Sequence, residues 1–226
     1  MGSGSTKLRL GVLASGGGTN LQSIIDACSA GDIDAQIVRV ICNNPNAGAL
    51  QRAERANIPN CCINHRDFDT RTAFDAAVIS QLQQDRVELV ILAGFMRIVG
   101  ADFIRAFTHR IMNIHPALLP AFPGLNVQKK ALEYGAKFTG CTVHFIDADV
   151  DTGPIIAQAV VPVFDDDTEE SLSARILEQE HRLYPHAIQL FAAGALKVEG
   201  RRVLIDPAYA NTGKFHASAL INPPPA

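Results

Sequence analysis

The chain has 226 residues, of which 47% are hydrophobic, and carries a formal net charge of −3 at pH 7. This composition supports a substantial core and excludes extensive disorder, and the small negative charge gives no general attraction for nucleic acid or for an anionic membrane. We therefore expect small-molecule partners and no nucleic-acid or membrane partner. Because no apolar run approaches the length needed to span a bilayer, we also expect a cytoplasmic location. We expect a monomer or a homodimer.

Strand and helix patterns alternate through the first half of the chain. Apolar runs predict strands at residues 8–13, 36–42, 58–63 and 87–93, and helical patterns lie between them at residues 20–29, 47–56 and 70–84. Strands that alternate with helices at this spacing are typical of βαβ units and of a parallel sheet. The fourth run is nearly all apolar, as expected for a strand covered on both faces.

The second half of the chain has a different pattern. Residues 141–146 and 155–163 read as longer strands with no helix between them, which favours an antiparallel pair. Residues 167–191 then predict a long helix that opens on Asp or Thr, carries acids in its first turn and closes near Gly194. Together the two halves predict an α/β fold: a Rossmann-like, mostly parallel sheet with helices on both faces and an antiparallel C-terminal strand addition.

The domain organisation follows from the absence of a convincing linker or repeat. We expect one domain over residues 8–200, a C-terminal extension over residues 201–226 that is partly flexible, and a flexible or artificial leader at residues 1–7. The five cysteines are odd in number and include no C-x-x-C pair. They predict neither disulfides nor a zinc site, but small buried apolar residues, and we expect no metal.

A glycine-rich turn follows the first predicted strand and opens the first predicted helix. Residues 14–20 read Ala-Ser-Gly-Gly-Gly-Thr-Asn, and exposed N–H groups with the helix dipole favour an anion at such a turn. A dinucleotide fingerprint would place glycine or alanine where Leu21 stands, and Asn43 and Asn44, rather than an acid, follow the second strand. The turn therefore favours a single phosphomonoester over NAD, although glycine could also serve the turn conformation alone.

A strand with two polar side chains on one face precedes a run of prolines. Asn113 and His115 are two residues apart, so they point to the same side of a strand, and Pro116 ends it because proline cannot donate to a sheet ladder. An amide beside a titratable imidazole at a strand end suits the stabilisation of an oxyanion. A lone histidine before proline more often serves structure than catalysis.

An Asp-rich loop (residues 147–154) joins the two strands of the second half. A calcium-binding EF-hand loop counted from Asp147 would need glycine at its sixth place and glutamate at its twelfth, where this chain has Thr152 and Gln158. Calcium binding is therefore a minor alternative, and the simplest interpretation of the loop is a solvated turn. One of the three aspartates could instead reach His115, orient it and favour its protonated form, but the residues alone do not choose among them.

Four segments in the same order closely resemble the phosphoribosylglycinamide formyltransferases, a folate-dependent family of purine synthesis. They are residues 15–22, 92–97, 113–120 and 144–154, and the resemblance extends over about residues 8–200. It implies transfer of a formyl group from the cosubstrate 10-formyltetrahydrofolate to the amine of phosphoribosylglycinamide. Alternatives are a related folate-dependent formyltransferase, a formyltetrahydrofolate hydrolase or a non-catalytic nucleotide-binding module.

The resemblance also implies roles for individual residues. It makes Asn113, His115 and the last aspartate of the loop, Asp151, catalytic. The implied substrate-binding residues are Gly18, Thr19, Asn20, Gln179 and Glu180. The implied folate-binding residues are Arg71, Met96, Arg97, Ile98, Val99 and Asp147.

Overall fold

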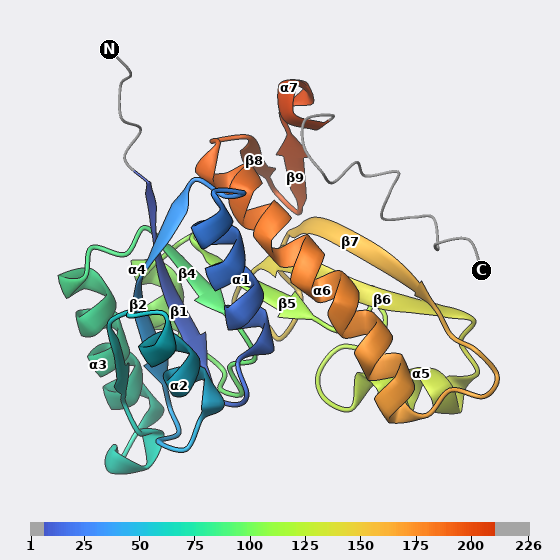
Figure 1. Cartoon of the computed structure of the whole chain (residues 1–226), viewed down its shortest axis with the longest axis horizontal. Coiled ribbons are helices and arrows are strands. Elements are labelled where there is room, and N and C mark those ends of the chain that lie inside the picture. Colours follow the sequence, from blue (N-terminus) through green and yellow to red (C-terminus); the bar gives the residue numbers. More distant parts are fainter. Residues whose placement is uncertain (1–6, 211–226) are drawn as a thin grey trace. The chain divides into compact units, whose positions relative to one another are not determined.

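The computed structural model describes residues 7–210 (Figure 1). The chain divides into two compact units, Met1–Ile111 and Met112–Ala226, which are described separately below. Most of the expected leader, residues 1–6, and the proline-rich end of the expected C-terminal extension lie outside the described residues. The expectation of one domain over residues 8–200 stays a prediction.

The first unit contains a parallel sheet. Its strands are β1 (Leu8–Ala14), β2 (Ala35–Cys42), β3 (Asn60–Cys62) and β4 (Leu89–Leu92), in the order β3-β2-β1-β4. Its helices are α1 (Thr19–Ala30), α2 (Gly48–Arg55), α3 (Arg71–Gln84) and α4 (Ala101–Ala106), with a 3-10 turn, η1 (His65–Asp67). All three strand pairs are parallel and β4 is fully buried, which confirms the predicted βαβ organisation.

The second unit is dominated by antiparallel pairing. Its strands are β5 (Ile111–His115), whose first residue closes the first unit, β6 (Phe138–Phe145), β7 (Ile155–Pro162), β8 (Leu196–Glu199) and β9 (Arg202–Ile205). Its helices are α5 (Val127–Tyr134), α6 (Glu169–Ala192) and α7 (Pro207–Ala210). Strand β6 runs antiparallel to β5 and β7, and β8 pairs antiparallel with β9. The predicted α/β fold with an antiparallel C-terminal addition is thus confirmed.

The elements that the sequence did not predict are short. They are η1, α4, α5, α7 and the two strands β8 and β9, none longer than eight residues. Strand β6 also begins at Phe138, three residues before its predicted start, because Phe138, Thr139 and Gly140 pair with β7. Gly140 interrupts the apolar pattern there, yet a Cβ at this position would lie 1.8 Å from the Ala159 carbonyl oxygen. Close approach of two backbones explains the glycine.

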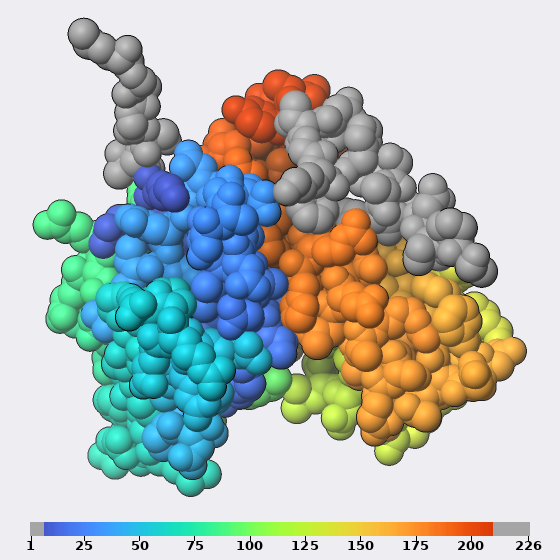
Figure 2. All heavy atoms as spheres, viewed as in Figure 1, coloured from blue at the N-terminus to red at the C-terminus, as the bar shows by residue number. Residues whose placement is uncertain are grey.

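Helix α6 begins and ends where its capping residues indicate. Thr168 is the N-cap and exchanges hydrogen bonds with Ser171 in a capping box, while Glu169 and Glu170 occupy the first turn near the positive end of the helix dipole. Gly194 lies just beyond the end with a φ of 68°. Figure 2 shows the outer face of this helix in orange, and its inner face holds buried residues such as Ile176 and Tyr184.

The five cysteines are free thiols, but only Cys42 and Cys141 are buried. Burial raises the pKa of the Cys42 thiol to about 12 and keeps it protonated. Cys28 and Cys61 are half-buried and Cys62 is exposed, so the prediction that cysteine serves here as a buried apolar residue was wrong for Cys62. Cys62 ends β3, the outermost strand of its sheet, where one neighbour is missing. In residues 7–210, no helix combines the length and apolarity needed to cross a membrane.

Tyr184 anchors β5 to helix α6 through a buried hydrogen bond. Its hydroxyl donates to the Met112 carbonyl at 2.8 Å, and the residue is 0% exposed. We predict that Tyr184→Phe lowers the free energy of unfolding by about 1–3 kcal/mol, because a buried carbonyl loses this donor. Urea denaturation measures the change. Tyr134→Phe is the matched control and is expected to change stability by less than about 0.5 kcal/mol, since Tyr134 is exposed; equal effects would contradict the prediction.

Candidate active site

Strand β5 brings Asn113 and His115 to one face, opposite two side chains of β6. The strand ends at His115, as Pro116 predicted. Asn113 lies directly across from His144, and His115 lies across from Thr142. The Asn113 Nδ2 atom is 3.2 Å from His144 Nε2. The antiparallel register therefore sets the position of the amide, because directly opposed side chains on one face touch.

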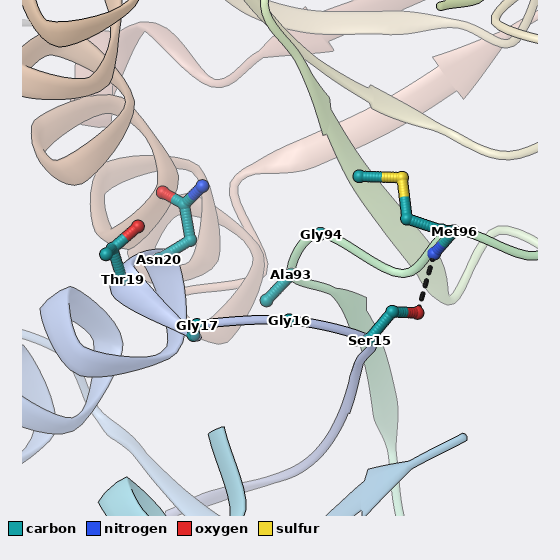
Figure 3. A pocket seen from close by; sticks show the side chains of 9 residues that line it. Ser15, Gly16, Gly17, Thr19, Asn20, Ala93, Gly94 and Met96 are labelled. Atoms are coloured by element: carbon teal, nitrogen blue, oxygen red, sulfur yellow. Dashed lines mark hydrogen bonds between the residues drawn. The ribbon is translucent and has the colours of Figure 1, made fainter. Parts of the chain in front are cut away.

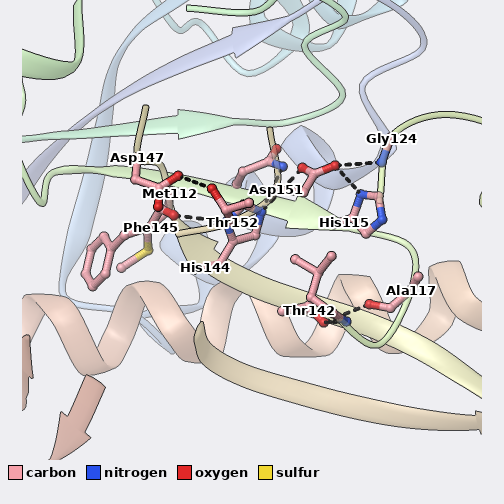
Figure 4. A network of polar contacts seen from close by, with 12 residues as sticks. Met112, His115, Ala117, Gly124, Thr142, His144, Phe145, Asp147, Asp151 and Thr152 are labelled. Atoms are coloured by element: carbon pink, nitrogen blue, oxygen red, sulfur yellow. Dashed lines mark hydrogen bonds and ion pairs between the residues drawn. The ribbon is translucent and has the colours of Figure 1, made fainter. Parts of the chain in front are cut away.

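His115 is buried and has an acceptor beside each ring nitrogen. Its Nε2 lies 2.8 Å from the Phe122 carbonyl oxygen. Its Nδ1 lies 3.4 Å from Asp151 Oδ2, a contact that Figure 4 shows. A backbone carbonyl and an ionised carboxylate can only accept hydrogen bonds, so both ring nitrogens must carry a proton for both contacts to be favourable. The arrangement thus suits an imidazolium cation paired with a carboxylate.

Of the three aspartates in the Asp-rich loop, Asp151 is the one that reaches His115. Its backbone is left-handed, with a φ of 56°, and its Oδ2 also accepts a 2.9 Å hydrogen bond from the Gly124 N–H. Asp147 instead accepts from the Thr152 hydroxyl at 2.6 Å, and Asp149 is exposed. The three residues Asn113, His115 and Asp151 are thus gathered within the second unit; their catalytic role stays a prediction.

His144 orients the amide of Asn113, and the sequence reasoning gave it no role. Its Nδ1–H donates to the Phe145 carbonyl at 2.9 Å, and burial lowers the pKa of the ring, so His144 is neutral and its Nε2 accepts from Asn113. Asp151 lies 3.8 Å from the same Nε2; with a neutral ring, we interpret this approach as packing and not as an ion pair. Only the pairing of β5 with β6 reveals the contact, because the two residues are 31 positions apart.

Two further contacts hold the loops around these side chains. The Thr142 hydroxyl donates to the Ala117 carbonyl at 2.7 Å and accepts from the Leu119 N–H at 3.0 Å, which fixes the loop that follows His115. Arg201 Nη2 donates to the Thr152 carbonyl at 3.0 Å from the turn between β8 and β9. Thr142 thus holds the loop that follows His115, and Arg201 holds the residue next to Asp151.

The first unit contains a pocket of about 300 Å³ at the glycine-rich turn (Figure 3). It is lined by Ser15, Gly16, Gly17, Gly18, Thr19, Asn20, Ala93, Gly94 and Met96. Gly18 is the N-cap of α1 with a φ of 73°, and a Cβ there would lie 2.8 Å from Ala49 Cα, so both conformation and space require glycine. Thr19 and Asn20 open α1, where backbone N–H groups and the dipole favour an anion.

Helix α2 supports this turn from outside the pocket. The Ala49 N–H donates to the Gly16 carbonyl at 3.1 Å, and Arg52 Nε donates to the Gly17 carbonyl at 2.7 Å. Both carbonyls are thus engaged by α2, which leaves the N–H side of the turn for a ligand. The sequence reasoning did not single out Arg52, since an arginine on an amphipathic helix ordinarily faces solvent.

Comparison with known proteins establishes the family. The formyl transferase family model matches residues 8–188. The chain belongs to the formyl transferase family. It is 43% identical to the phosphoribosylglycinamide formyltransferase of Haemophilus influenzae over 198 residues, which are 88% of this chain and 93% of that protein.

Two further relatives show how the chain corresponds to larger proteins and to solved structures. It is 51% identical to the trifunctional purine biosynthetic protein adenosine-3 of Drosophila melanogaster over 188 residues, 82% of this chain, and spans only 14% of that protein's length. The crystal structure of glycinamide ribonucleotide transformylase 1 from Symbiobacterium toebii matches with a TM-score of 0.87 and 54% identity, covering 88% of this chain and 94% of that one.

In this formyl transferase, hydrogen bonds within the first unit hold both ends of the expected folate loop (residues 96–99). The Met96 N–H donates to the Ser15 hydroxyl at 2.8 Å, and the Gly100 N–H, just after the loop, donates to Asp75 Oδ2 at 2.7 Å. Met96 is 70% and Ile98 61% exposed, so the loop presents apolar side chains outward, whereas Val99 is buried. Asp75 was missed because a single acid within a helix carries no recognisable pattern.

Asp75 is a buried carboxylate on which the charges of two arginines of the predicted folate site act. It is 3% exposed, and the charges of Arg71 and Arg97 act on it. Burial raises the pKa of the carboxyl above its ordinary value, although the Gly100 hydrogen bond and the two arginines oppose the rise. Asp75 thus ties the end of the loop to α3, the helix that also carries Arg71.

The remaining predicted binding residues lie in the second unit. Glu180 is buried on α6, its neighbour Gln179 is half-buried, and the charge of Glu180 adds to burial in raising the pKa of the Cys141 thiol. In residues 7–210, no group of three or more histidine, cysteine or acidic side chains is arranged to hold a metal ion. The predicted contacts of Glu180, Gln179 and Asp147 with ligands stay predictions.

The buried charge of Asp75 predicts a pH-dependent difference in stability. Because folding raises the pKa of this carboxyl, its contribution favours the fold at acidic pH and is lost as the pH rises through the folded value. Asp75→Asn keeps an acceptor for Gly100 but cannot ionise, so we expect it to be more stable than the wild type at pH 7 and to lose this advantage toward pH 4. Urea denaturation at both values measures this, and Asp149→Asn is the exposed control. A variant less stable at pH 7 would mean that attraction to the arginines dominates.

Proposed function

We propose that this protein transfers the formyl group of 10-formyltetrahydrofolate to the amine of phosphoribosylglycinamide. Membership of the formyl transferase family and the names of its full-length relatives support this reaction. The observation that carries the proposal is the contact of Asp151 with His115. The other ring nitrogen of His115 faces a backbone carbonyl, and strand β5, which carries His115, also presents Asn113. Such a group offers one amide hydrogen-bond donor, from Asn113, and a positive charge where an oxyanion forms.

In the proposed mechanism, the substrate amine attacks the formyl carbon and a carbon–nitrogen bond forms. The carbonyl oxygen then carries negative charge in a tetrahedral intermediate. The Asn113 amide nitrogen has two hydrogens, and since His144 accepts one, the other is available to the oxygen. A protonated His115, paired with Asp151, would supply positive charge beside it.

The second half of the proposed reaction returns the folate as a leaving group. The bond between the formyl carbon and the folate nitrogen breaks, and one proton must leave the attacking nitrogen while the departing nitrogen gains one. The Asp151–His115 pair holds a proton between an acid and a base, which suits it to pass this proton. Asp151 is assigned the acceptor role because its carboxylate is the base of the pair.

Binding assignments follow the same proposal. The glycine-rich turn, with Gly18, Thr19 and Asn20, would hold the phosphate, because it offers the N-terminus of α1 and a pocket of about 300 Å³. Glu180 and Gln179 would contact the ribose of the same substrate. The donor folate would be held by the loop at residues 96–99, by Arg71 and by Asp147.

A formyltetrahydrofolate hydrolase is the alternative that the same residues favour, since water could replace the amine as the nucleophile. Incubation with 10-formyltetrahydrofolate, followed by folate absorbance, separates the two reactions. We expect absorbance to change only when phosphoribosylglycinamide is added, with the formylated product forming at the same rate. Formate release without the acceptor would identify a hydrolase, and no reaction with either would refute the proposal.

The acid–base pair predicts a specific kinetic defect. We expect Asp151→Asn and His115→Ala to lower kcat by about 100-fold or more with much smaller changes in either KM, because the lost interactions act on the transition state. Steady-state kinetics measures both constants, and circular dichroism checks folding. The matched control is Asp149→Asn, an exposed aspartate of the same loop, which should retain near-normal turnover. A folded Asp151→Asn enzyme with normal kcat would remove Asp151 from the mechanism.

The phosphate site predicts the opposite kinetic pattern. We expect the double variant Thr19→Ala with Asn20→Ala to raise KM for phosphoribosylglycinamide by about tenfold or more while kcat changes little, since these residues would bind a group that does not react. KM for the folate should stay close to normal. Thr108→Ala, in which the lost hydroxyl bonds to the Ile104 carbonyl at the end of α4, is the control. An unchanged KM for the phosphorylated substrate would contradict the assignment.

A further inference from the structure

Ser15 connects the glycine-rich turn to the loop at residues 96–99. Its backbone N–H donates to the Gly94 carbonyl at 3.1 Å, and its hydroxyl accepts from the Met96 N–H at 2.8 Å (Figure 3). The two strands that lead into these segments, β1 and β4, are adjacent and in register at Leu13 and Leu92. One residue thus makes two hydrogen bonds to the segment that opens the loop.

The direction of the hydroxyl is fixed from behind by Asn43. The Ser15 hydroxyl donates its single hydrogen to Asn43 Oδ1 at 2.6 Å, so only its lone pairs remain for Met96. Asn43 is 5% exposed and follows β2, and its Nδ2 and carbonyl oxygen both lie within 3.2 Å of His65 Nδ1. The hydroxyl is therefore a pre-oriented acceptor and cannot rotate freely.

Ser15 and Met96 both line the pocket at the glycine-rich turn. A ligand that orders the glycine-rich turn also acts on Ser15, which holds Met96. A ligand that orders the loop at residues 96–99 acts on Ser15 through Met96. Coupling between two binding sites is reciprocal in free energy. The hydrogen bond between Ser15 and Met96 gives such coupling a physical route through a single pair of atoms.

We propose that Ser15, oriented by Asn43, is a positioning residue that couples binding of the phosphorylated substrate at the glycine-rich turn to binding of the folate at residues 96–99. This inference rests on the proposed function, which assigns the two ligands. Ser15 itself takes no part in bond making. Its removal should therefore weaken the cooperation between the ligands more than it weakens either ligand alone.

The first test observes the hydrogen bond directly. In the ¹⁵N-labelled protein, we expect Ser15→Ala to speed hydrogen exchange of the Met96 amide by about threefold to tenfold, the loss of one hydrogen bond. Saturating phosphoribosylglycinamide should slow Met96 exchange in the wild type but not in Ser15→Ala. Ser29→Ala on α1, where the hydroxyl bonds only to the Ile25 carbonyl of its own helix, is the control and should behave as the wild type. Unchanged Met96 exchange in Ser15→Ala overturns the inference.

The second test measures coupling by calorimetry. The affinity for 5-formyltetrahydrofolate, a non-transferring probe, is determined with and without saturating phosphoribosylglycinamide. We expect the ratio of the two affinities to exceed one in the wild type and in Ser29→Ala, to fall to about one in Ser15→Ala, and to recover in Ser15→Thr, which keeps the hydroxyl. If Ser15→Ala does not fold, Ser15→Cys keeps the volume with a weak acceptor and takes its place.

The outcomes separate this inference from the proposed function. A wild-type protein without formyl transfer overturns the proposed function and this inference with it. An active wild type with a ratio of one, or with the same ratio in Ser15→Ala, overturns the coupling role of Ser15 alone. Loss of the ratio in Ser29→Ala as well would show a general loss of structure and would equally overturn the specific role.

Discussion

The pairing of β5 with β6 is the constraint on which the candidate site depends. It sets Asn113 against His144 and His115 against Thr142, so that one register supplies the acceptor for the amide and fixes the loop after the histidine. A slip by one residue would turn these side chains to the other face of the strand. The hydrogen bond from Tyr184 to Met112 ties β5 to helix α6, and the close approach at Gly140 holds β6 against β7. The contacts that pack the second unit therefore also place the side chains of the candidate site.

Asp151 reaches His115 at a conformational cost that its neighbours offset. A left-handed backbone at a non-glycine residue costs roughly 1–2 kcal/mol, although aspartate tolerates it better than most. The Gly124 N–H bonds to the carboxylate, Arg201 donates to the Thr152 carbonyl, and the Thr152 hydroxyl donates to Asp147 within the loop. The hydrogen bond from the Gly124 N–H holds the Asp151 carboxylate in place while it faces His115. Strain at this residue is therefore consistent with a role in orienting His115.

The sequence predicted those features that arise from local pattern. Alternating strands and helices, the end of β5 at Pro116 and the Thr168 cap of α6 all follow from residues close together in the chain. Partners across the sheet did not follow, because His144 meets Asn113 only through the register of two strands, and Asp75 meets Gly100 only through packing of α3. The residues alone left three aspartates open for His115, and only the resemblance to a family singled out Asp151.

Buried polar residues support the predicted site residues in each of the two units. Asp75 and Asn43 lie behind the loop and the turn of the first unit, and His144 lies behind Asn113 in the second. None of these three residues belongs to the predicted site. Each of them nevertheless fixes the direction of one hydrogen-bond donor or acceptor that lies in the predicted site or next to it. Burying such groups costs stability unless every partner is in place, so their hydrogen bonds restrict the site to one geometry. A transfer between two bound molecules depends on that restriction, because proximity and orientation lower the barrier only when both partners are held in position.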